Sequence, residues 1–165
     1  MMSRNRILFA FLLLPLCFIL PLHIYIIGDN LGAGIQGAFF RFQVTAFGNS
    51  FGFLNQDLEY IITGIYTGKT IVSTLLWIIA GVFLLFGTAI SLIQPYERTP
   101  RFIKKPGLFI IAGGILFLIS CIVQYGYLFH GAAGISIPVG VPLLLVSGWF
   151  IQYHLDVDKP ESSDM

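Results

Sequence analysis

Four long apolar stretches dominate the pattern of this chain. They cover Ile7–Ile27, Thr70–Gln94, Pro106–Phe129 and Ile135–Tyr153, and none of the 9 basic and 8 acidic residues lies in any of them. A helix needs about 20 apolar residues to cross the ~30 Å hydrocarbon core of a bilayer. The stretches are too long for the strands of a membrane barrel and lack their alternation. The pattern therefore predicts four membrane-spanning helices.

A different pattern fills the loop 28–69, between the first two stretches. After a glycine-rich turn, residues 39–47 alternate, with Phe40 and Phe42 on one face and polar residues such as Arg41 on the other. The alternation resumes at residues 50–53, and a Gly-Asn pair between two such runs is typical of a hairpin. The sequence predicts a β-hairpin that turns at Gly48-Asn49.

The end of this loop changes to helical spacing. Apolar residues recur at positions 58, 61, 62 and 65, and Asp57 and Glu59 lie near the start, where carboxylates favour a helix N-terminus. Asn55 is a suitable N-cap. We expect a short amphipathic helix here, with Gly64, Gly68 and Lys69 turning the chain into the membrane.

Together these elements predict an all-α membrane protein of a single domain. It is a four-transmembrane-helix bundle with a small β-hairpin and amphipathic helix between the first two helices. Four spans with a β-bearing first outer loop are similar to the architecture of claudins. The loop here has neither the W-GLW signature nor the cysteine pair of that family, so the similarity extends to architecture alone.

Basic residues predict the orientation in a cell membrane. Seven of them lie at the N-terminus, in the loop 95–105 or in the tail 154–165, whereas only Arg41 and Lys69 lie in the loop 28–69. Cytoplasmic loops carry the excess of basic residues, so both termini are expected in the cytoplasm.

Composition agrees with a membrane protein, since only 10% of residues are charged and mean hydropathy is +0.86. The net charge of +1 excludes a nucleic-acid partner.

The sequence lacks the usual signals of catalysis. Cys17 and Cys121 form no C-x-x-C pair, and the glycine-rich stretches lack the lysine of a phosphate-binding loop. His23 and His130, with Asp57 or Glu59, give only a weak indication of a metal site, because the spacing of a ligand set is absent. No catalytic residue, cofactor or metal is therefore expected.

Two groups of residues remain as candidate sites in the outer loops. The first is an apolar face for a partner chain or for lipid, formed by Phe40, Phe42, Phe51 and Phe53. The same phenylalanines would alternatively pack on the outer ends of the helices. The second candidate site is a polar cluster at the outer surface, formed by Arg41, Asp57, Glu59, Lys69 and His130.

These features favour a non-catalytic accessory or structural subunit. It would dock a membrane-protein partner or a second copy through its outer loop and through the glycine-rich faces of its helices, in contact with membrane lipids. Those small residues would otherwise serve packing within the bundle. The alternative is a membrane-interface enzyme or lipid-binding protein that uses the polar cluster. A channel formed by several copies is the third hypothesis.

Overall fold

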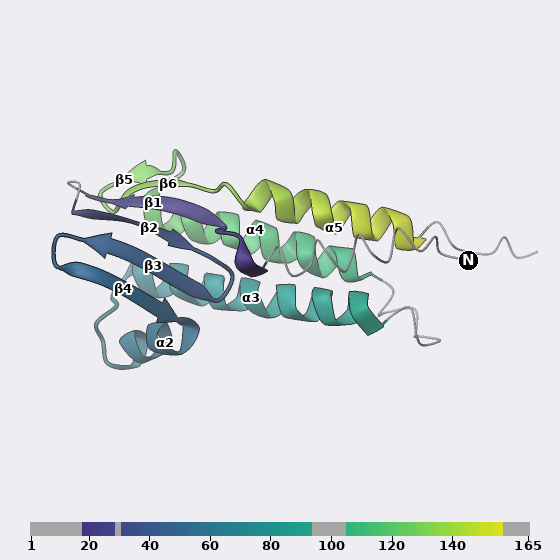
Figure 1. The fold of residues 1–165 in the computed structure, drawn as a ribbon, viewed down its shortest axis with the longest axis horizontal. Helices are drawn as coiled ribbons and strands as arrows, with labels where there is room; N and C mark the ends of the chain where they lie inside the picture. The colour runs from purple at the N-terminus through teal and green to yellow at the C-terminus, as the bar shows by residue number, and fades with distance from the viewer. Residues whose placement is uncertain (1–17, 29–30, 94–104, 157–165) are drawn as a thin grey trace, which may run out of the picture.

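The computed structural model describes residues 18–28, 31–93 and 105–156. Within these ranges the chain forms four helices and one six-stranded antiparallel sheet (Figure 1). The strands are β1 (His23–Ile27), β2 (Gly32–Gln36), β3 (Phe40–Thr45), β4 (Gly48–Phe53), β5 (His130–Gly131) and β6 (Gly134–Ile137). The helices are α2 (Leu54–Ile62), α3 (Lys69–Ile93), α4 (Pro106–Tyr125) and α5 (Val141–Asp156).

The prediction of an all-α bundle of four membrane-spanning helices is wrong. The expected first span, Ile7–Ile27, ends in strand β1, and its residues 7–17 lie outside the described residues. The expected fourth span begins inside strand β6, and α5 starts only at Val141. An apolar run does not by itself distinguish a buried strand from a helix. Here Pro138 follows β6, so one apolar run contains a strand and then a shorter helix.

Two described helices are long and apolar enough to cross a membrane: Lys69–Ser91 within α3, and α4. Less than half of each is buried within the chain, so both present apolar side chains outward. The apolar part of α5, Val141–Tyr153, is shorter. Helix α3 matches the expected second span closely, whereas α4 ends at Tyr125, before the expected Phe129, and is followed by the C-cap Gly126 with a φ of +96°.

The sheet has the strand order β4-β3-β2-β1-β6-β5. Four of its strands follow one another along the chain, and the other two come from the connection between α4 and α5, where β6 pairs with β1. The predicted hairpin is confirmed as β3–β4, with Phe42 opposite Phe51. Its turn lies at residues 46–47, not at Gly48-Asn49, because the Thr45 hydroxyl accepts the Phe47 N–H and donates to the Gly48 carbonyl.

The short helix expected after the hairpin is present as α2. Its N-cap is Phe53, not Asn55, and no side chain caps it. Asp57 lies in its first turn and is buried, whereas Leu58 and Ile62 are exposed. The helix therefore turns the Asp57 carboxylate inward and the apolar side chains of Leu58 and Ile62 outward. Gly64 and Gly68 follow with positive φ values of 75° and 55°, conformations that glycine adopts without strain.

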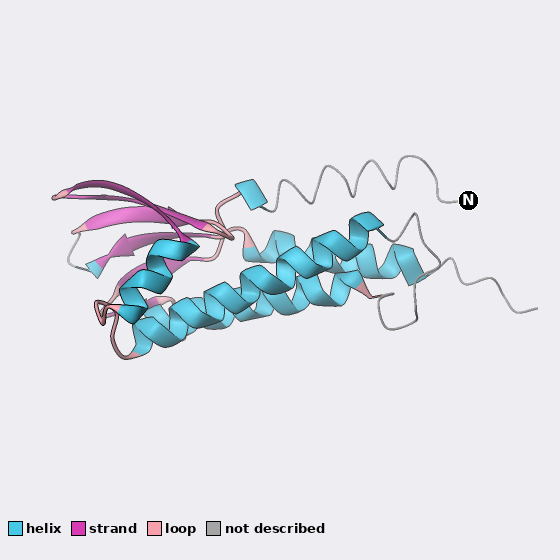
Figure 2. Cartoon of the chain, turned by 90° about the horizontal axis from the view of Figure 1, so that it is seen from below, coloured by secondary structure: helices cyan, strands magenta, loops and turns pink. Residues whose placement is uncertain are grey.

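The sheet lies at one end of the long helices and covers the start of α3 (Figures 1 and 2). The indole Nε1–H of Trp77 donates to the Gly37 carbonyl between β2 and β3, at 3.0 Å. One turn further along α3, a Cβ on Gly81 would lie 3.0 Å from the Phe39 ring. The sheet is thus anchored to the part of α3 that precedes Gly81.

The glycine-rich helix faces pack against neighbouring helices of the same chain. A Cβ on Gly107 of α4 would lie 2.3 Å from the Gly148 carbonyl oxygen of α5, and one on Gly113 would lie 3.1 Å from the Ala80 carbonyl oxygen of α3. Small residues allow this close approach of helices in lipid. The core around these contacts includes Leu84, Phe117 and Leu144.

Candidate functional site

The two faces of the sheet carry opposite kinds of side chain. Alternate residues of a strand point to opposite faces, and one set here is polar while the other is apolar. The polar set faces the helices, as its contacts with α2, α3 and α4 show. It comprises His23 and Tyr25 on β1, Gln36 on β2, Arg41 and Gln43 on β3, and Ser136 on β6.

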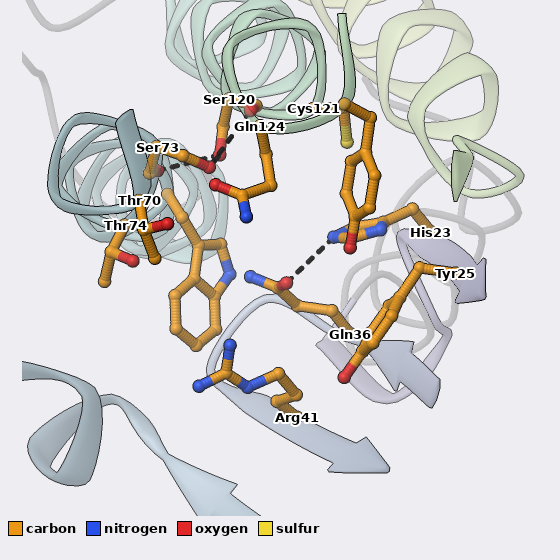
Figure 3. A pocket seen from close by; sticks show the side chains of 12 residues that line it. His23, Tyr25, Gln36, Arg41, Thr70, Ser73, Thr74, Ser120, Cys121 and Gln124 are labelled. Atoms are coloured by element: carbon orange, nitrogen blue, oxygen red, sulfur yellow. Dashed lines mark hydrogen bonds between the residues drawn. The ribbon is translucent and has the colours of Figure 1, made fainter. Parts of the chain in front are cut away.

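A polar cavity lies between this inner face and the ends of α3 and α4. Its outer part has a volume of about 540 Å³ and is lined by both sheet and α2 residues, among them Gln43 and Asp57. Its inner part, about 60 Å³, reaches the side chains of Ser73 and Trp77 (Figure 3). Tyr25, Arg41 and Gln124 line both parts. The two volumes therefore adjoin and form one site.

An ion pair of Arg41 and Asp57 joins β3 to α2 at the outer part of the cavity. Asp57 Oδ1 accepts from Arg41 Nη2 and, at 2.7 Å, from the Tyr66 hydroxyl. The Arg41 guanidinium lies 5.7 Å from the centre of the Tyr66 ring, within cation–π range. Three segments of the chain, β3, α2 and the connection to α3, meet at this cluster.

Burial and charge shift the pKa values in this cluster. Burial opposes the charge of Arg41, but the Asp57 carboxylate and Tyr66 outweigh it and raise the pKa of Arg41 above its ordinary value. Burial also raises the pKa of Tyr66 to about 12. The arginine is therefore charged and the phenol protonated throughout the physiological range, so both act as hydrogen-bond donors.

His23 is a buried neutral imidazole at the inner part of the cavity. Its Nε2 lies 2.9 Å from Gln36 Oε1 and its Nδ1 lies 2.9 Å from the Ser136 hydroxyl. Burial, more than any other cause, lowers its pKa to about 4. The neutral ring thus donates from Nε2 to Gln36 and accepts at Nδ1 from Ser136. The Tyr125 ring lies edge-on to it, with centroids 6.3 Å apart.

Two oxygen atoms at the cavity are buried and have no hydrogen-bond partner among the described residues. They are Asp57 Oδ2 and Gln124 Oε1. A buried polar atom without a partner is destabilising by about 1–3 kcal/mol, and such atoms are uncommon in folded proteins. Both atoms are acceptors, and both belong to residues that line the cavity.

The outer face of the sheet is apolar over five strands, with two polar residues on its edge strands, Asn49 on β4 and His130 on β5. Phe51 and Phe53 are 52% and 54% exposed, and Ile137, on the other half of the sheet, is 59% exposed. Phe40 stacks on Phe51, with ring centroids 5.9 Å apart. We call this surface the outer face. It comprises Ile24, Ile26, Ala33, Ile35, Phe40, Phe42, Val44, Phe51, Phe53, Ile135 and Ile137.

The two predicted groups of site residues fare differently in the structure. All four phenylalanines, Phe40, Phe42, Phe51 and Phe53, belong to the outer face, so the structure brings them together. Of the predicted polar cluster only Arg41 and Asp57 meet. The other three members, Glu59, Lys69 and His130, are exposed on α2, α3 and β5 and do not line the cavity.

The weak metal hypothesis finds no support where the chain is described. His23 is buried at the inner face and His130 is exposed on β5. No three histidine, cysteine or acidic side chains within residues 18–28, 31–93 and 105–156 are grouped so as to hold a metal ion. Cys121 is a buried free thiol at the inner part of the cavity, and Cys17 lies outside the described residues.

Several cavity residues were not singled out from the sequence: Tyr25, Gln36, Tyr66 and Gln124. His23 and Tyr25 alternate with Ile24 and Ile26, which is the spacing of a half-buried strand. This spacing favours a strand, but residues 23–27 also continue the apolar stretch Ile7–Ile27, which predicts the end of a helix there. Gln124 lies near the end of the expected span Pro106–Phe129, and the sequence does not indicate which residue it would contact. No protein-family model matches this sequence, and a comparison with curated proteins finds no significant relative.

Proposed function

We propose that this chain is a membrane-anchored accessory subunit that docks another membrane protein through the outer face of its sheet. The observation that carries the proposal is the orientation of the side chains of the sheet. Its polar side chains point toward the helices and its apolar side chains point outward. Helices α3 and α4 supply the membrane anchor. The proposal therefore gives the sheet the role of a binding surface.

The composition of the outer face supports a protein partner. Monomeric soluble surfaces rarely expose contiguous apolar patches larger than a few hundred Å², and eleven apolar side chains lie on this one. Phe51 contacts both Phe40 and Phe53, which gives a cluster of three rings. Aromatic residues are enriched at the centres of protein interfaces. This cluster is the anchor that we expect to contribute most to binding.

The edges of the sheet favour protein over acyl chains as the cover. Strand β4 pairs only with β3, and β5 only with β6, among the described strands. Open edges expose unpaired backbone N–H and C=O groups, which do not occur in contact with hydrocarbon. We infer that the sheet stands outside the hydrocarbon core, where an apolar face needs a protein to remove it from water. The glycine-rich helix faces are occupied within the chain and do not take part.

Photo-cross-linking in native membranes tests the docking proposal. We expect p-benzoylphenylalanine at position 51 to give one protein adduct of defined mass, because this side chain lies within the interface. The same residue at position 47 is the matched control, since Phe47 is 94% exposed at the hairpin turn and lies off the outer face. A Phe53→Ser substitution should reduce the adduct severalfold without changing thermal stability. Adducts with lipid alone, or with a second copy of the chain, would contradict the proposal.

We also propose that the sheet lies outside the cell membrane and that both termini lie in the cytoplasm. Support comes from the basic residues at positions 98, 101, 104 and 105, between α3 and α4. Helix α5 ends beside the start of α4, since Gln152 packs against Gly107, so the end of α5 and the start of α4 lie on the same side of the helices.

Cysteine labelling in intact cells tests this orientation. With Cys17 and Cys121 replaced by alanine, a membrane-impermeant maleimide should label Asn49→Cys and leave Thr99→Cys and Ser162→Cys unlabelled. Permeabilised cells should label all three positions, which controls for accessibility. Labelling of the last two positions in sealed cells, with position 49 protected, would reverse the orientation.

A further inference from the structure

We propose that the cavity at the inner face of the sheet binds a neutral, hydroxyl-rich group of the size of a monosaccharide or polyol. This chemistry is shared by free sugars and by the headgroups of glycosylated lipids. The site lies on the opposite side of the sheet from the outer face, and Phe51 of the edge strand β4 borders both. It is therefore separate from the docking function, and either proposal can fail alone.

Two unpaired acceptors define what the ligand must supply. Asp57 is 1% exposed, and its Oδ1 is used by Arg41 and Tyr66 while its Oδ2 has no partner. Gln124 Oε1 is likewise buried without a partner, on the α4 side of the same cavity (Figure 3). A single molecule that satisfied both atoms would carry at least two donors, set apart from one another. Hydroxyl groups on a ring or a polyol chain meet this requirement.

The charges around the cavity favour a neutral ligand. Among the described residues that line it, Arg41 and Asp57 are the only Lys, Arg, Asp or Glu, and they neutralise one another. An anion placed here would approach Asp57, and a cation would approach Arg41. Because the pair is already formed, neither kind of ion gains a free countercharge. A hydroxyl donor satisfies Asp57 Oδ2 without disturbing the pair.

The remaining lining suits a ring with polar edges. Tyr25, Tyr60, Tyr66 and Tyr125 provide aromatic surface, and Gln43 and Gln56 provide amide donors and acceptors. Aromatic rings can cover the C–H face of a sugar while the amides pair with its hydroxyls. The outer part of the cavity, at about 540 Å³, is within the ~300–1,000 Å³ range of small-molecule sites.

Calorimetric titration of the purified full chain tests the site. The chain is kept in lauryldimethylamine oxide, because a glucoside or maltoside detergent would itself present the proposed ligand chemistry. The probes are methyl glucoside, methyl galactoside and myo-inositol. We expect at least one to bind saturably, and Gln124→Leu to weaken it about tenfold, the loss of one hydrogen bond to a buried group. The matched control is Gln152→Leu, which removes another unpaired buried oxygen far from the cavity.

A second variant and a second probe make the outcome decisive. Asp57→Asn keeps the shape of the side chain and should also weaken binding. If Asp57→Asn fails to fold, Gln124→Leu still tests the site, because it leaves the ion pair untouched. Nanodiscs that contain a glycosyl diacylglycerol, compared with phosphatidylcholine alone, separate a lipid source from a free sugar by native mass spectrometry. Binding of tetramethylammonium in place of every hydroxylated probe would overturn the proposal. The absence of saturable binding by any probe in either preparation would do the same.

Discussion

Replacing Arg41 by methionine (Arg41→Met) should lower the free energy of unfolding by about 3 kcal/mol. Removing one partner of a buried ion pair typically destabilises a protein by ~3–5 kcal/mol, because the other charge stays buried and uncompensated. The Asp57 side chain is 1% exposed, and after the substitution the Tyr66 hydroxyl is its remaining donor. We place the effect at the lower end because the Arg41 side chain is itself 25% exposed. Chemical unfolding in detergent, followed by circular dichroism, measures the change.

The double variant Arg41→Met/Asp57→Leu separates the charge effect from general damage to the sheet. Replacing both members of a buried pair by apolar groups is often close to neutral, so the double variant should recover most of the lost stability. Lys69→Met is the matched control, because Lys69 is exposed at the start of α3 and no effect above ~0.5 kcal/mol is expected. If the double variant is no more stable than Arg41→Met, the buried charge of Asp57 is not the cause.

Local periodicity predicted the elements whose pattern is self-contained. The alternation covers residues 39–47 and resumes at 50–53, and the structure contains the corresponding hairpin with Phe42 opposite Phe51. Residues 70–94 are mostly apolar and contain no charged residue, and α3 occupies nearly the same range. In both cases the signal lies within one stretch of chain. No partner segment is needed to interpret it.

The six-stranded sheet depended on partners that are distant in sequence. Strand β6 pairs with β1, which lies more than 100 residues earlier, with Ile137 opposite Ile24. Both segments are apolar enough to continue into neighbouring helices, so their composition alone indicated membrane spans. The sequence also did not predict which face of the sheet packs toward the helices. An apolar face normally turns toward the core of a protein, and here the core-facing side of β3 carries Arg41 and Gln43.

The candidate site was predicted in part for the same reason. The sequence groups Arg41 and Asp57 because both lie in the one polar loop, and in the structure they form an ion pair. Glu59 and Lys69 were grouped with them on the same ground. Asp57 and Glu59 are two residues apart on α2, about half a helical turn, so Asp57 points inward and Glu59 outward. Only the packing of α2 against the sheet determines which carboxylate enters the cavity.

Acidification should destabilise the protein through His23. The pKa of this imidazole is about 4 in the folded chain, mainly because burial disfavours its charged form, against an ordinary value of 6.5. Between these two values the unfolded chain binds a proton that the folded chain does not, so stability falls as the pH falls from about 6.5 toward 4. Above about 6.5 the ring is neutral in both states and its contribution is constant. From pH 7 to pH 4.5 the loss should be roughly 2–3 kcal/mol.

Comparison with His23→Gln isolates this contribution from the titration of carboxylates, which both proteins share. Glutamine retains an amide donor toward Gln36 and an acceptor toward Ser136, the two partners of the neutral imidazole, but it does not titrate. The variant should therefore lose roughly 2–3 kcal/mol less stability than the parent chain between pH 7 and pH 4.5, as measured by unfolding in detergent at each pH. Equal losses of stability in the two proteins would show that His23 is protonated in the folded chain without destabilising it. In that case the inner part of the cavity would admit enough water to solvate an imidazolium beside Arg41.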